Sequence, residues 1–263
     1  MGERKKYHRG RRKKKKGGII STLILIIAIA VFCVSGYQLY KIFGGYHQGK
    51  SEYDKVREVA VHGDDKDEDE FAVDFDELKK INADTVGWIR FYPEPSQISY
   101  PLVQTTDNDL YLNRTFSANE NTVGAIFVNC DNASDFSDRN TIIYGHRMKD
   151  HSMFHDLEKY EDESFWKENP YFYIYTPDGR KLSCHIYSAG IVKDTSSTYL
   201  TQFASDEEYQ AFLDDTKRAG AYHTGVEVTT DQRVVTLSTC TAASDDNRMV
   251  VRGVIESEDV VKK

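Results

Sequence analysis

From residue 71 onward the sequence predicts a mainly β domain, either a barrel or a sandwich. Eight short runs of β-branched and aromatic residues, separated by turn residues, fall within about 185 residues. Three segments in this part of the chain show helical spacing, at residues 74–81, 153–160 and 206–218. Many short strands with few helices are typical of closed or stacked β-sheets. One apolar segment near the N-terminus adds a predicted membrane helix.

The first 40 residues have the charge pattern of a signal anchor. Residues 1–16 hold ten Lys or Arg and one Glu, and residues 17–40 hold no charged side chain. As a helix, the second segment would be about 36 Å long, enough to cross a hydrocarbon core of about 30 Å. Because the basic residues come first, we expect a single-pass cell-membrane protein with a cytoplasmic tail at residues 1–16 and the rest outside. The alternative is a signal peptide cleaved near residues 34–36, but the apolar run is long for such a peptide.

The chain beyond the basic tail is acidic. The formal net charge of −8 becomes −17 when the +9 of residues 1–16 is left out. Such a charge argues against a nucleic-acid partner. Residues 41–70 contain few large apolar side chains and end in an acidic run, so we interpret them as an extracellular stalk with a helix around residues 52–61. The alternative is that this helix belongs to the domain, which we place at residues 71–263.

The elements of the domain are predicted from apolar spacing and from turn residues. The segment at residues 74–81 begins with an N-cap aspartate, Asp74, and has apolar residues at helical spacing. Asp178 and Gly179 lie between two aromatic and β-branched runs and predict a hairpin. We expect strands at residues 86–91, 98–104, 124–129, 141–144, 171–175, 181–192, 233–240 and 249–255.

Cysteine usage predicts a free thiol. Cys33 lies in the apolar N-terminal segment, which leaves Cys130, Cys184 and Cys240 in the exported part. An odd number of cysteines there leaves at least one unpaired. A bridge between Cys130 and Cys184 stays open, although Cys184 alternates within a strand like a small buried hydrophobic residue.

Three residues at strand ends form a candidate catalytic site. Cys240 ends one strand and Arg248 begins the next, so antiparallel pairing would place them side by side. His146 follows a short apolar strand that stops at Gly145. A free thiol with a pKa near 8.5 is only about 3% thiolate at pH 7, so it needs a base such as an imidazole. The imidazole can then protonate a leaving amine while the guanidinium binds the carbonyl or its oxyanion, which together indicate acyl transfer.

Each of these residue types also has an ordinary interpretation. A cysteine at a strand end is often a packing residue, and a histidine beside Arg147 is often a surface residue. Arg248 can pair with a nearby carboxylate such as Asp245 or Asp246. The occurrence of all three residues at strand ends, rather than within strands, favours the catalytic interpretation.

A zinc site is a separate alternative. His146, His151 and His155 lie close together in the sequence and, with Cys240, offer nitrogen and sulfur ligands. Their spacing matches no compact zinc motif, so we predict neither a metal ion nor a cofactor.

The motifs around these residues resemble those of sortases, the membrane-anchored cysteine transpeptidases of Gram-positive bacteria. The matching segments are Tyr-Gly-His146-Arg-Met, Thr-Leu-Ser-Thr-Cys240 and Arg248-Met-Val-Val, in the order His, Cys, Arg. The resemblance covers roughly residues 71–255. The Gly-His-Arg-Met motif, the Tyr-Phe-Tyr-Ile-Tyr strand and the long helical insert before the cysteine strand are similar to class B. Arg252 has the same strand parity as Arg248, but the Arg-Met-Val-Val match selects Arg248.

The resemblance implies a fold and a reaction. The fold is a closed eight-stranded β-barrel with helices on its N-terminal side and a helix before the cysteine strand. In the implied reaction, Cys240 attacks the threonine carbonyl of a C-terminal sorting motif in an exported protein, and an amine of peptidoglycan resolves the thioester. His146 would be the general acid and base, and Arg248 would stabilise the carbonyl or oxyanion.

The resemblance also implies a peptide groove beside the cysteine strand. Ser238 shares a strand face with Cys240, whereas Thr239 points the other way and would act through its backbone. Further candidate groove residues, from the connection before the cysteine strand, are Tyr199, Leu200 and Tyr222.

Three other functions stay open at this point. They are a cysteine endopeptidase that releases its product to water, a sortase that joins pilin subunits through a lysine side chain, and a membrane-anchored binding module. The presence of Cys240, His146 and Arg248 together argues against the binding module.

Overall fold

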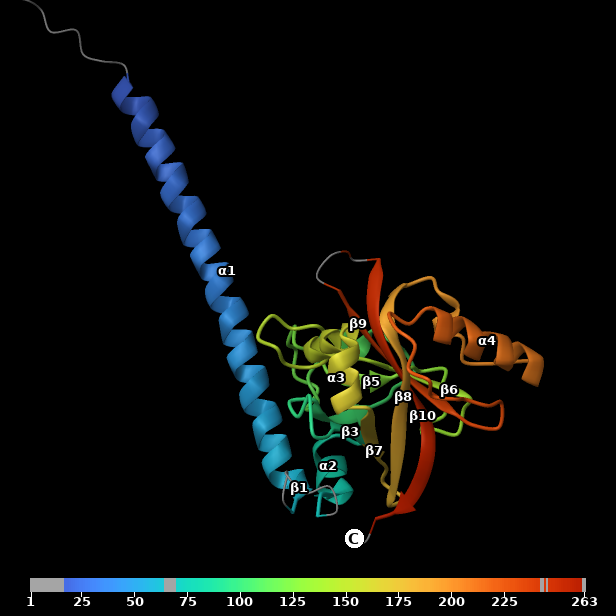
Figure 1. Cartoon of the computed structure of the whole chain (residues 1–263). Coiled ribbons are helices and arrows are strands. Elements are labelled where there is room, and N and C mark those ends of the chain that lie inside the picture. The colour runs from blue at the N-terminus through green and yellow to red at the C-terminus, as the bar shows by residue number, and fades with distance from the viewer. Residues whose placement is uncertain (1–16, 64–69, 242–243, 245, 262–263) are drawn as a thin grey trace, which may run out of the picture. The chain divides into compact units, whose positions relative to one another are not determined.

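The computed structural model describes the chain except for residues 1–16, 64–69, 242–243, 245 and 262–263. The chain divides into two compact units, Met1–Gly44 and Gly45–Lys263. Helix α1 (Gly17–Ala60) contributes residues to both units (Figure 1).

The part of α1 in the first unit is apolar and exposed. Its large hydrophobic side chains from Leu23 to Tyr40 are each at least 54% exposed. Soluble proteins rarely expose such a continuous apolar surface, and by length and composition the segment can cross a membrane. These properties agree with the membrane helix predicted at residues 17–40.

The part of α1 in the second unit contributes to the core of the domain. Tyr53, Val56 and Ala60 are 5%, 3% and 0% exposed and belong to the main hydrophobic cluster. Their spacing of three and four residues puts them on one face of the helix. The structure therefore differs from the stalk predicted at residues 41–70, because the residues from Gly45 onward belong to the second unit. A few apolar residues at helical spacing are enough to dock a helix, even where the apolar content is low.

Tyr53→Phe is expected to lower the free energy of unfolding of the fragment Gly45–Lys263 by about 1–3 kcal/mol. The Tyr53 hydroxyl donates to the Gly124 carbonyl at 2.7 Å and accepts from the Phe116 N–H at 3.2 Å, so phenylalanine leaves two buried groups unpaired. Urea unfolding followed by circular dichroism measures the change. Glu58→Gln, at an exposed position of the same helix, should stay within about 0.5 kcal/mol. Equal effects of the two substitutions would contradict the docking of this helix.

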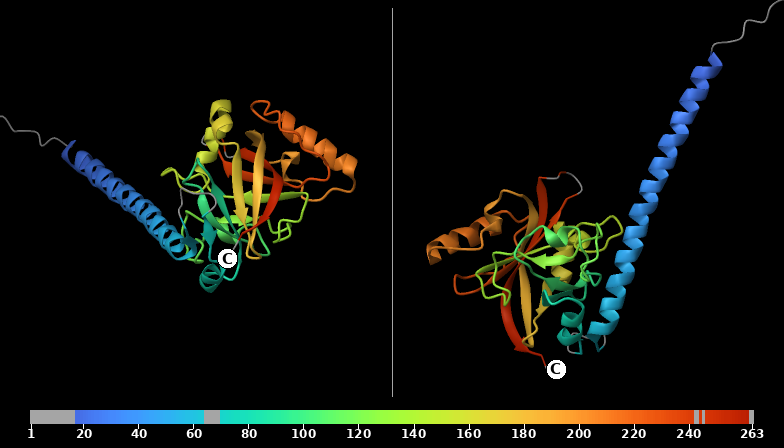
Figure 2. Two further views of the ribbon diagram at one scale, coloured as in Figure 1. Left: turned by 60° about the horizontal axis from the view of Figure 1, so that its bottom comes forward. Right: turned by 180° about the vertical axis from the view of Figure 1, so that it is seen from behind.

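Eight strands of the second unit close into a barrel, which confirms the predicted fold (Figure 1, Figure 2). The strands are β3 (Thr85–Phe91), β4 (Ser99–Val103), β5 (Ile126–Val128), β6 (Asn140–Tyr144), β7 (Tyr171–Tyr175), β8 (Arg180–Lys193), β9 (Val234–Cys240) and β10 (Asn247–Val260). Their order around the barrel is β10, β8, β7, β3, β4, β5, β6, β9, and β9 pairs again with β10. The pairs β4 with β5 and β6 with β9 are parallel, and the other pairs are antiparallel.

All eight predicted strands are present, and the longest two, β8 and β10, extend beyond their predicted ends. The predicted hairpin joins β7 to β8. Its turn is closed by the Thr176 N–H, which donates to the Arg180 carbonyl at 2.9 Å. Gly179 has a φ of +88°, a conformation that glycine adopts without steric cost.

Short helices and two further strands occupy the connections. They are β1 (Val61–His62), β2 (Ala72–Val73), α2 (Phe75–Ile81), the 3-10 helices η1 (Leu110–Leu112), η2 (His155–Glu161) and η3 (Ser197–Tyr199), and the helices α3 (Glu163–Glu168) and α4 (Asp206–Arg218). The predicted helices at residues 74–81 and 206–218 are confirmed as α2 and α4, and the insert predicted at 153–160 is the 3-10 helix η2. The sequence did not predict α3, because six residues are too few to show a helical period.

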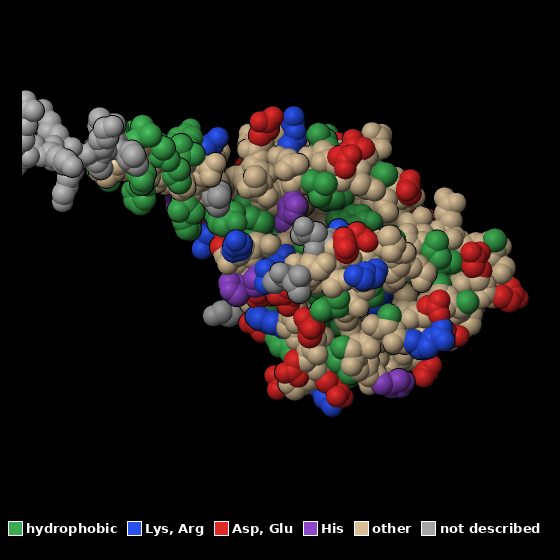
Figure 3. Space-filling view, turned by 90° about the horizontal axis from the view of Figure 1, so that it is seen from above, with side chains coloured by type: hydrophobic (Ala, Val, Ile, Leu, Met, Phe, Trp, Pro, Cys, Tyr) green, Lys and Arg blue, Asp and Glu red, His purple; other side chains and the backbone are tan. Residues whose placement is uncertain are grey.

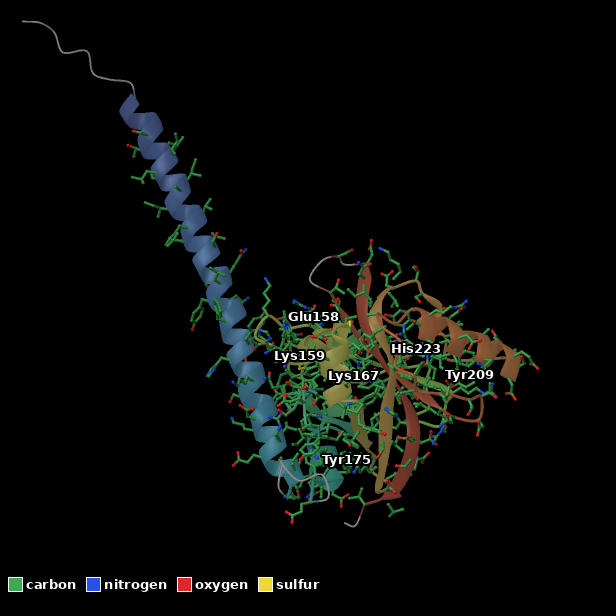
Figure 4. The ribbon with its side chains drawn as sticks, in the orientation of Figure 1. Glu158, Lys159, Lys167, Tyr175, Tyr209 and His223 are labelled. Atoms are coloured by element: carbon green, nitrogen blue, oxygen red, sulfur yellow. The ribbon has the colours of Figure 1, made fainter. Side chains whose placement is uncertain are left out.

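Alternate residues of β9 pack on opposite sides of the barrel wall. Val235 and Leu237 belong to the main hydrophobic cluster inside the barrel. Val234 belongs to a second cluster that includes Tyr209 of α4, so α4 covers the outer side of this wall (Figure 4). Cys240 shares the parity of Val234 and therefore lies on the outer side.

All four cysteines are free thiols. Cys33 and Cys240 are exposed, Cys130 is partly exposed and Cys184 is buried. The bridge between Cys130 and Cys184 that the sequence left open is therefore not formed. Burial raises the pKa of the Cys184 thiol, so this residue is an inert packing residue, as its place in the strand pattern indicated.

Candidate active site

Cys240 and Arg248 face each other across two neighbouring strands. Cys240 ends β9 and is paired with Arg248, the second residue of β10. Cys240 is exposed and the side chain of Arg248 is 25% exposed, so a bound peptide can contact both. This end of the barrel is at the top of Figure 1 and faces the viewer in Figure 3, where acidic, basic and hydrophobic side chains are interspersed. Cys240 and Arg248 are therefore adjacent, as the sequence predicted.

His146 reaches the same end of the barrel through the parallel pairing of β6 with β9. Tyr144 of β6 is paired with Ser238 of β9, and the Gly145 N–H donates to the Ser238 carbonyl at 3.2 Å. His146 lies two residues after Tyr144, and Cys240 lies two residues after Ser238. The imidazole and the thiol are therefore at the same level of the barrel wall.

One hydrogen bond decides which ring nitrogen of His146 can act as a base. The Nε2 atom lies 2.7 Å from the carbonyl oxygen of Leu112, and a carbonyl oxygen can only accept. Nε2 therefore donates its proton, and Nδ1 of the neutral ring keeps its lone pair. Gly124 makes room for the ring, because a Cβ atom there would lie 2.7 Å from the imidazole Cδ2. No sequence pattern indicated that Leu112 and Gly124 support the site.

Arg248 has a carboxylate neighbour that the sequence did not indicate. Its Nη2 lies 3.8 Å from Oδ2 of Asp194, and its Nη1 donates to the Asn247 carbonyl at 3.0 Å. Of the predicted alternatives, Asp245 lies outside the described residues, and the Asp246 carbonyl accepts from the Asp194 N–H at 3.0 Å. A 3.8 Å contact between partly exposed groups is a weak ion pair. The side chain of Arg248 is 25% exposed, so a substrate can reach the guanidinium.

Arg252 has different surroundings although it shares the strand parity of Arg248. It is 0% exposed, and it donates to Ser188 Oγ at 3.0 Å and to Thr198 Oγ1 at 2.7 Å. Burial lowers the pKa of its guanidinium. These contacts join η3 to the barrel wall, so Arg252 supports the structure and Arg248 is the guanidinium that a peptide can reach.

Three of the predicted groove residues lie on or near β9. The hydroxyls of Tyr199 and Ser238 are 2.9 Å apart, and the Tyr199 ring stacks on that of Tyr144 with centroids 6.3 Å apart. Burial raises the pKa of Tyr199, so its hydroxyl stays protonated at neutral pH. Leu200 follows and is 43% exposed. The structure thus brings Tyr199 and Ser238 close to Cys240, since Ser238 precedes it by two residues. Leu200 lies further from Cys240, because its carbonyl accepts from the Asn140 side chain at 2.8 Å and Asn140 is paired with Val234 at the start of β9.

The other two predicted groove residues have different environments. Thr239 is 2% exposed, and its side chain points into the barrel, away from that of Cys240. The Tyr222 hydroxyl donates to the Tyr160 carbonyl at 3.0 Å, and its ring centroid lies 5.9 Å from that of Trp166. These contacts hold Tyr222 against η2 and α3, and neither of them joins it to Cys240.

Similar known proteins identify the family of this chain. A family model described as the sortase domain matches residues 94–256. A curated sortase B from Listeria monocytogenes is 32% identical over 242 aligned residues, which cover 88% of this chain and 94% of that protein. This chain belongs to the sortase family.

Solved structures show that this sortase has the class B fold. The Staphylococcus aureus sortase B–substrate complex is 35% identical, with a TM-score of 0.65, over 72% of this chain and 85% of that one. A sortase B complexed with triglycine is 35% identical, also with a TM-score of 0.65, over 72% of this chain and 86% of that one. This sortase is accordingly a transpeptidase, with an N-terminal helix that is apolar enough to span a membrane.

Proposed function

We propose that this sortase cleaves a C-terminal sorting motif of exported proteins after threonine, through a thioester on Cys240, and transfers the acyl group to a peptidoglycan amine. The observation that carries the proposal is the convergence of Cys240, Arg248 and His146 at one end of β6, β9 and β10. The site supplies a nucleophile, a proton carrier and a fixed positive charge, which are the three groups that acyl transfer needs.

In the first step, Nδ1 of His146 takes the proton of the Cys240 thiol, and the sulfur attacks the threonine carbonyl. The oxyanion that forms lies against the guanidinium of Arg248, which stabilises its charge. When this intermediate collapses, the imidazolium gives its proton to the leaving amine and the C–N bond breaks. The Leu112 carbonyl keeps Nε2 in place, so the ring returns to the same tautomer.

In the second step, an amine attacks the thioester. His146 takes a proton from the attacking amine and returns one to the sulfur, so a new amide forms and Cys240 is free again. The sortase B solved with triglycine supports a peptide amine as the acceptor in this sortase too. The sortase B–substrate complex likewise supports a peptide as the acyl donor.

Ser238, Tyr199 and Leu200 form part of the proposed peptide groove. The Tyr199–Ser238 hydrogen bond fixes both hydroxyls beside the thiol, and Leu200 offers an exposed apolar side chain to the motif. Thr239 contributes its backbone only. Tyr222 forms a more distant wall of the groove.

The proposed topology puts the reaction outside the cell. Residues 1–16 stay in the cytoplasm because of their positive charge, residues 17–40 cross the membrane, and the second unit is extracellular. Exported proteins then meet the enzyme at the membrane that they have just crossed.

Mass spectrometry of the fragment Gly45–Lys263 tests the proposal. The fragment is incubated with a library of peptides that contain a threonine at the proposed cleavage position, with and without a stem peptide that contains diaminopimelate. We expect an adduct on Cys240 that disappears as an amide product forms. Hydrolysis at a rate unchanged by the amine would instead indicate a peptidase. Absence of any adduct, although Cys240 alkylates readily, would contradict the proposed class of motif.

A further inference from the structure

A second group of polar side chains lies in the loop between β6 and η2 and at the start of η2. One ring nitrogen each of His151 and His155 and one carboxylate oxygen of Asp156 lie within 4.8 Å of one another. We propose that these three side chains bind a divalent transition-metal ion of the zinc class, at a site separate from Cys240.

The spacing of the ligand atoms is close to that of a tetrahedral zinc site. Bonds of about 2.0–2.1 Å from zinc to nitrogen or oxygen put neighbouring ligand atoms about 3.4 Å apart. Nδ1 of His151 and Oδ1 of Asp156 are already 3.3 Å apart. The ring centroids of His151 and His155 are 4.0 Å apart. Since no two of the three ligand atoms are more than 4.8 Å apart, an approach of at most about 1.4 Å would bring them to the zinc spacing, and a water molecule would take the fourth position.

The surroundings of the group also favour an ion. Asp156 is 3% exposed, and Lys159 Nζ lies 2.8 Å from its Oδ2, which leaves Oδ1 toward His151. Within the part of the chain that the structure describes, the buried Nδ1 of His155 has no hydrogen-bond partner. Buried polar atoms are usually bonded, so the polar groups around this ring are not all satisfied by protein contacts. The side chain of His151 is 63% exposed, so the ion can enter from solvent.

The alternative arrangement is an ion pair between a protonated His151 and Asp156. This pair accounts for the 3.3 Å contact between their atoms. It leaves the buried nitrogen of His155 without a partner, and it puts a positive imidazolium against a second imidazole ring. A metal ion instead joins two neutral rings to the same carboxylate, so no imidazolium is held against a second ring.

A bound ion would also fasten the loop that begins at His146. Arg147 is joined to Met153 by an isolated β-bridge and to Glu158 of η2 by a 2.9 Å ion pair. Figure 4 shows Glu158 and Lys159, both of η2, at the same edge of the domain. The ion adds a second link between this loop and η2, so it should stabilise the folded chain.

Zinc binding by the full chain in detergent micelles, without a polyhistidine tag, tests the site. Cys240→Ala is the starting protein, because it lacks the exposed thiol that would also bind zinc. We expect one zinc ion per chain by isothermal titration calorimetry and a higher melting temperature in zinc sulfate. His151→Ala, at a largely exposed side chain that tolerates truncation, should weaken zinc binding by at least about tenfold and abolish the shift. His155→Ala should have the same effect.

His223→Ala is the matched control. His223 is exposed and lies well away from Glu158 in Figure 4, so its removal should leave zinc binding unchanged. Cobalt(II) gives a second readout, since a four-coordinate cobalt ion absorbs visible light, and this band should disappear in His151→Ala. Failure of the Cys240→Ala protein to bind zinc, or an equal loss in His223→Ala, would overturn the proposal.

Discussion

Cys240→Ala is expected to abolish the acyl-enzyme and to slow peptide cleavage by at least about 10³-fold. Cys240 is the nucleophile of the proposed reaction, and loss of a nucleophile leaves only the rate enhancement that binding and charge provide. Alanine keeps the backbone pairing with Arg248 and removes one exposed sulfur, so the fold should not change. Intact-protein mass spectrometry and the rate of peptide cleavage measure the two effects.

Cys130→Ala is the control for this substitution. Cys130 is also a free, partly exposed thiol, but burial raises its pKa and it follows β5 rather than β9. We expect this variant to form the acyl-enzyme at the normal rate. Cleavage that survives in Cys240→Ala and is lost in Cys130→Ala would refute the assignment of the nucleophile.

The barrel could be predicted because its strands have strong local signals. In β9, Val235 and Leu237 pack inside while Val234 packs outside, so the alternation and its ends are visible in the sequence. The Asp178-Gly179 turn marks the end of β7 and the start of β8. Closure into a barrel, rather than a sandwich, depends on the pairing of β9 with both β6 and β10, and only the family resemblance implied it.

The docking of α1 on the domain could not be predicted from local pattern. Tyr53 bonds to Gly124, 71 residues away, and to Phe116, 63 residues away. The hydrophobic spacing of this helix is short and interrupted by charged residues, so it resembles that of a stalk. Contacts of such long sequence separation are a property of the folded chain alone.

The candidate site could be predicted in its side chains but not in its backbone supports. Cys240 and His146 stand out because strand ends and residue type are both visible in the sequence. The role of the Leu112 carbonyl is not visible in the sequence, because every residue has a backbone carbonyl. Asp194 follows β8 and comes beside Arg248 only through the register of β8 with β10.

The sequence and the structure also differ in the residues that they place together with His151 and His155 as possible metal ligands. The sequence grouped His151 and His155 with His146 and Cys240 as possible zinc ligands, whereas the structure groups them with Asp156. Asp156 was not singled out because exposed acidic residues are common. Its burial becomes apparent only when η2 packs on the barrel.

Arg248→Lys is expected to lower the rate of acyl-enzyme formation by about 10²-fold, with little change in stability. Lysine keeps the positive charge at the start of β10 but replaces a planar fork by a single ammonium group. The ammonium group cannot present two parallel N–H donors as the guanidinium does, so it stabilises the developing oxyanion less well. Single-turnover kinetics of thioester formation measure the loss, and the melting temperature reports on the fold.

Asp194→Asn separates this catalytic role from a structural one. The substitution removes the weak ion pair, which joins Nη2 and Oδ2 at 3.8 Å, and leaves the guanidinium in place. If Arg248 acts on the substrate, Asp194→Asn should keep the rate of thioester formation within a few-fold, because the fork is intact. If Arg248 serves only to hold Asp194, both variants should lose activity equally. Since a pair at this distance and exposure contributes little to stability, we expect the first outcome.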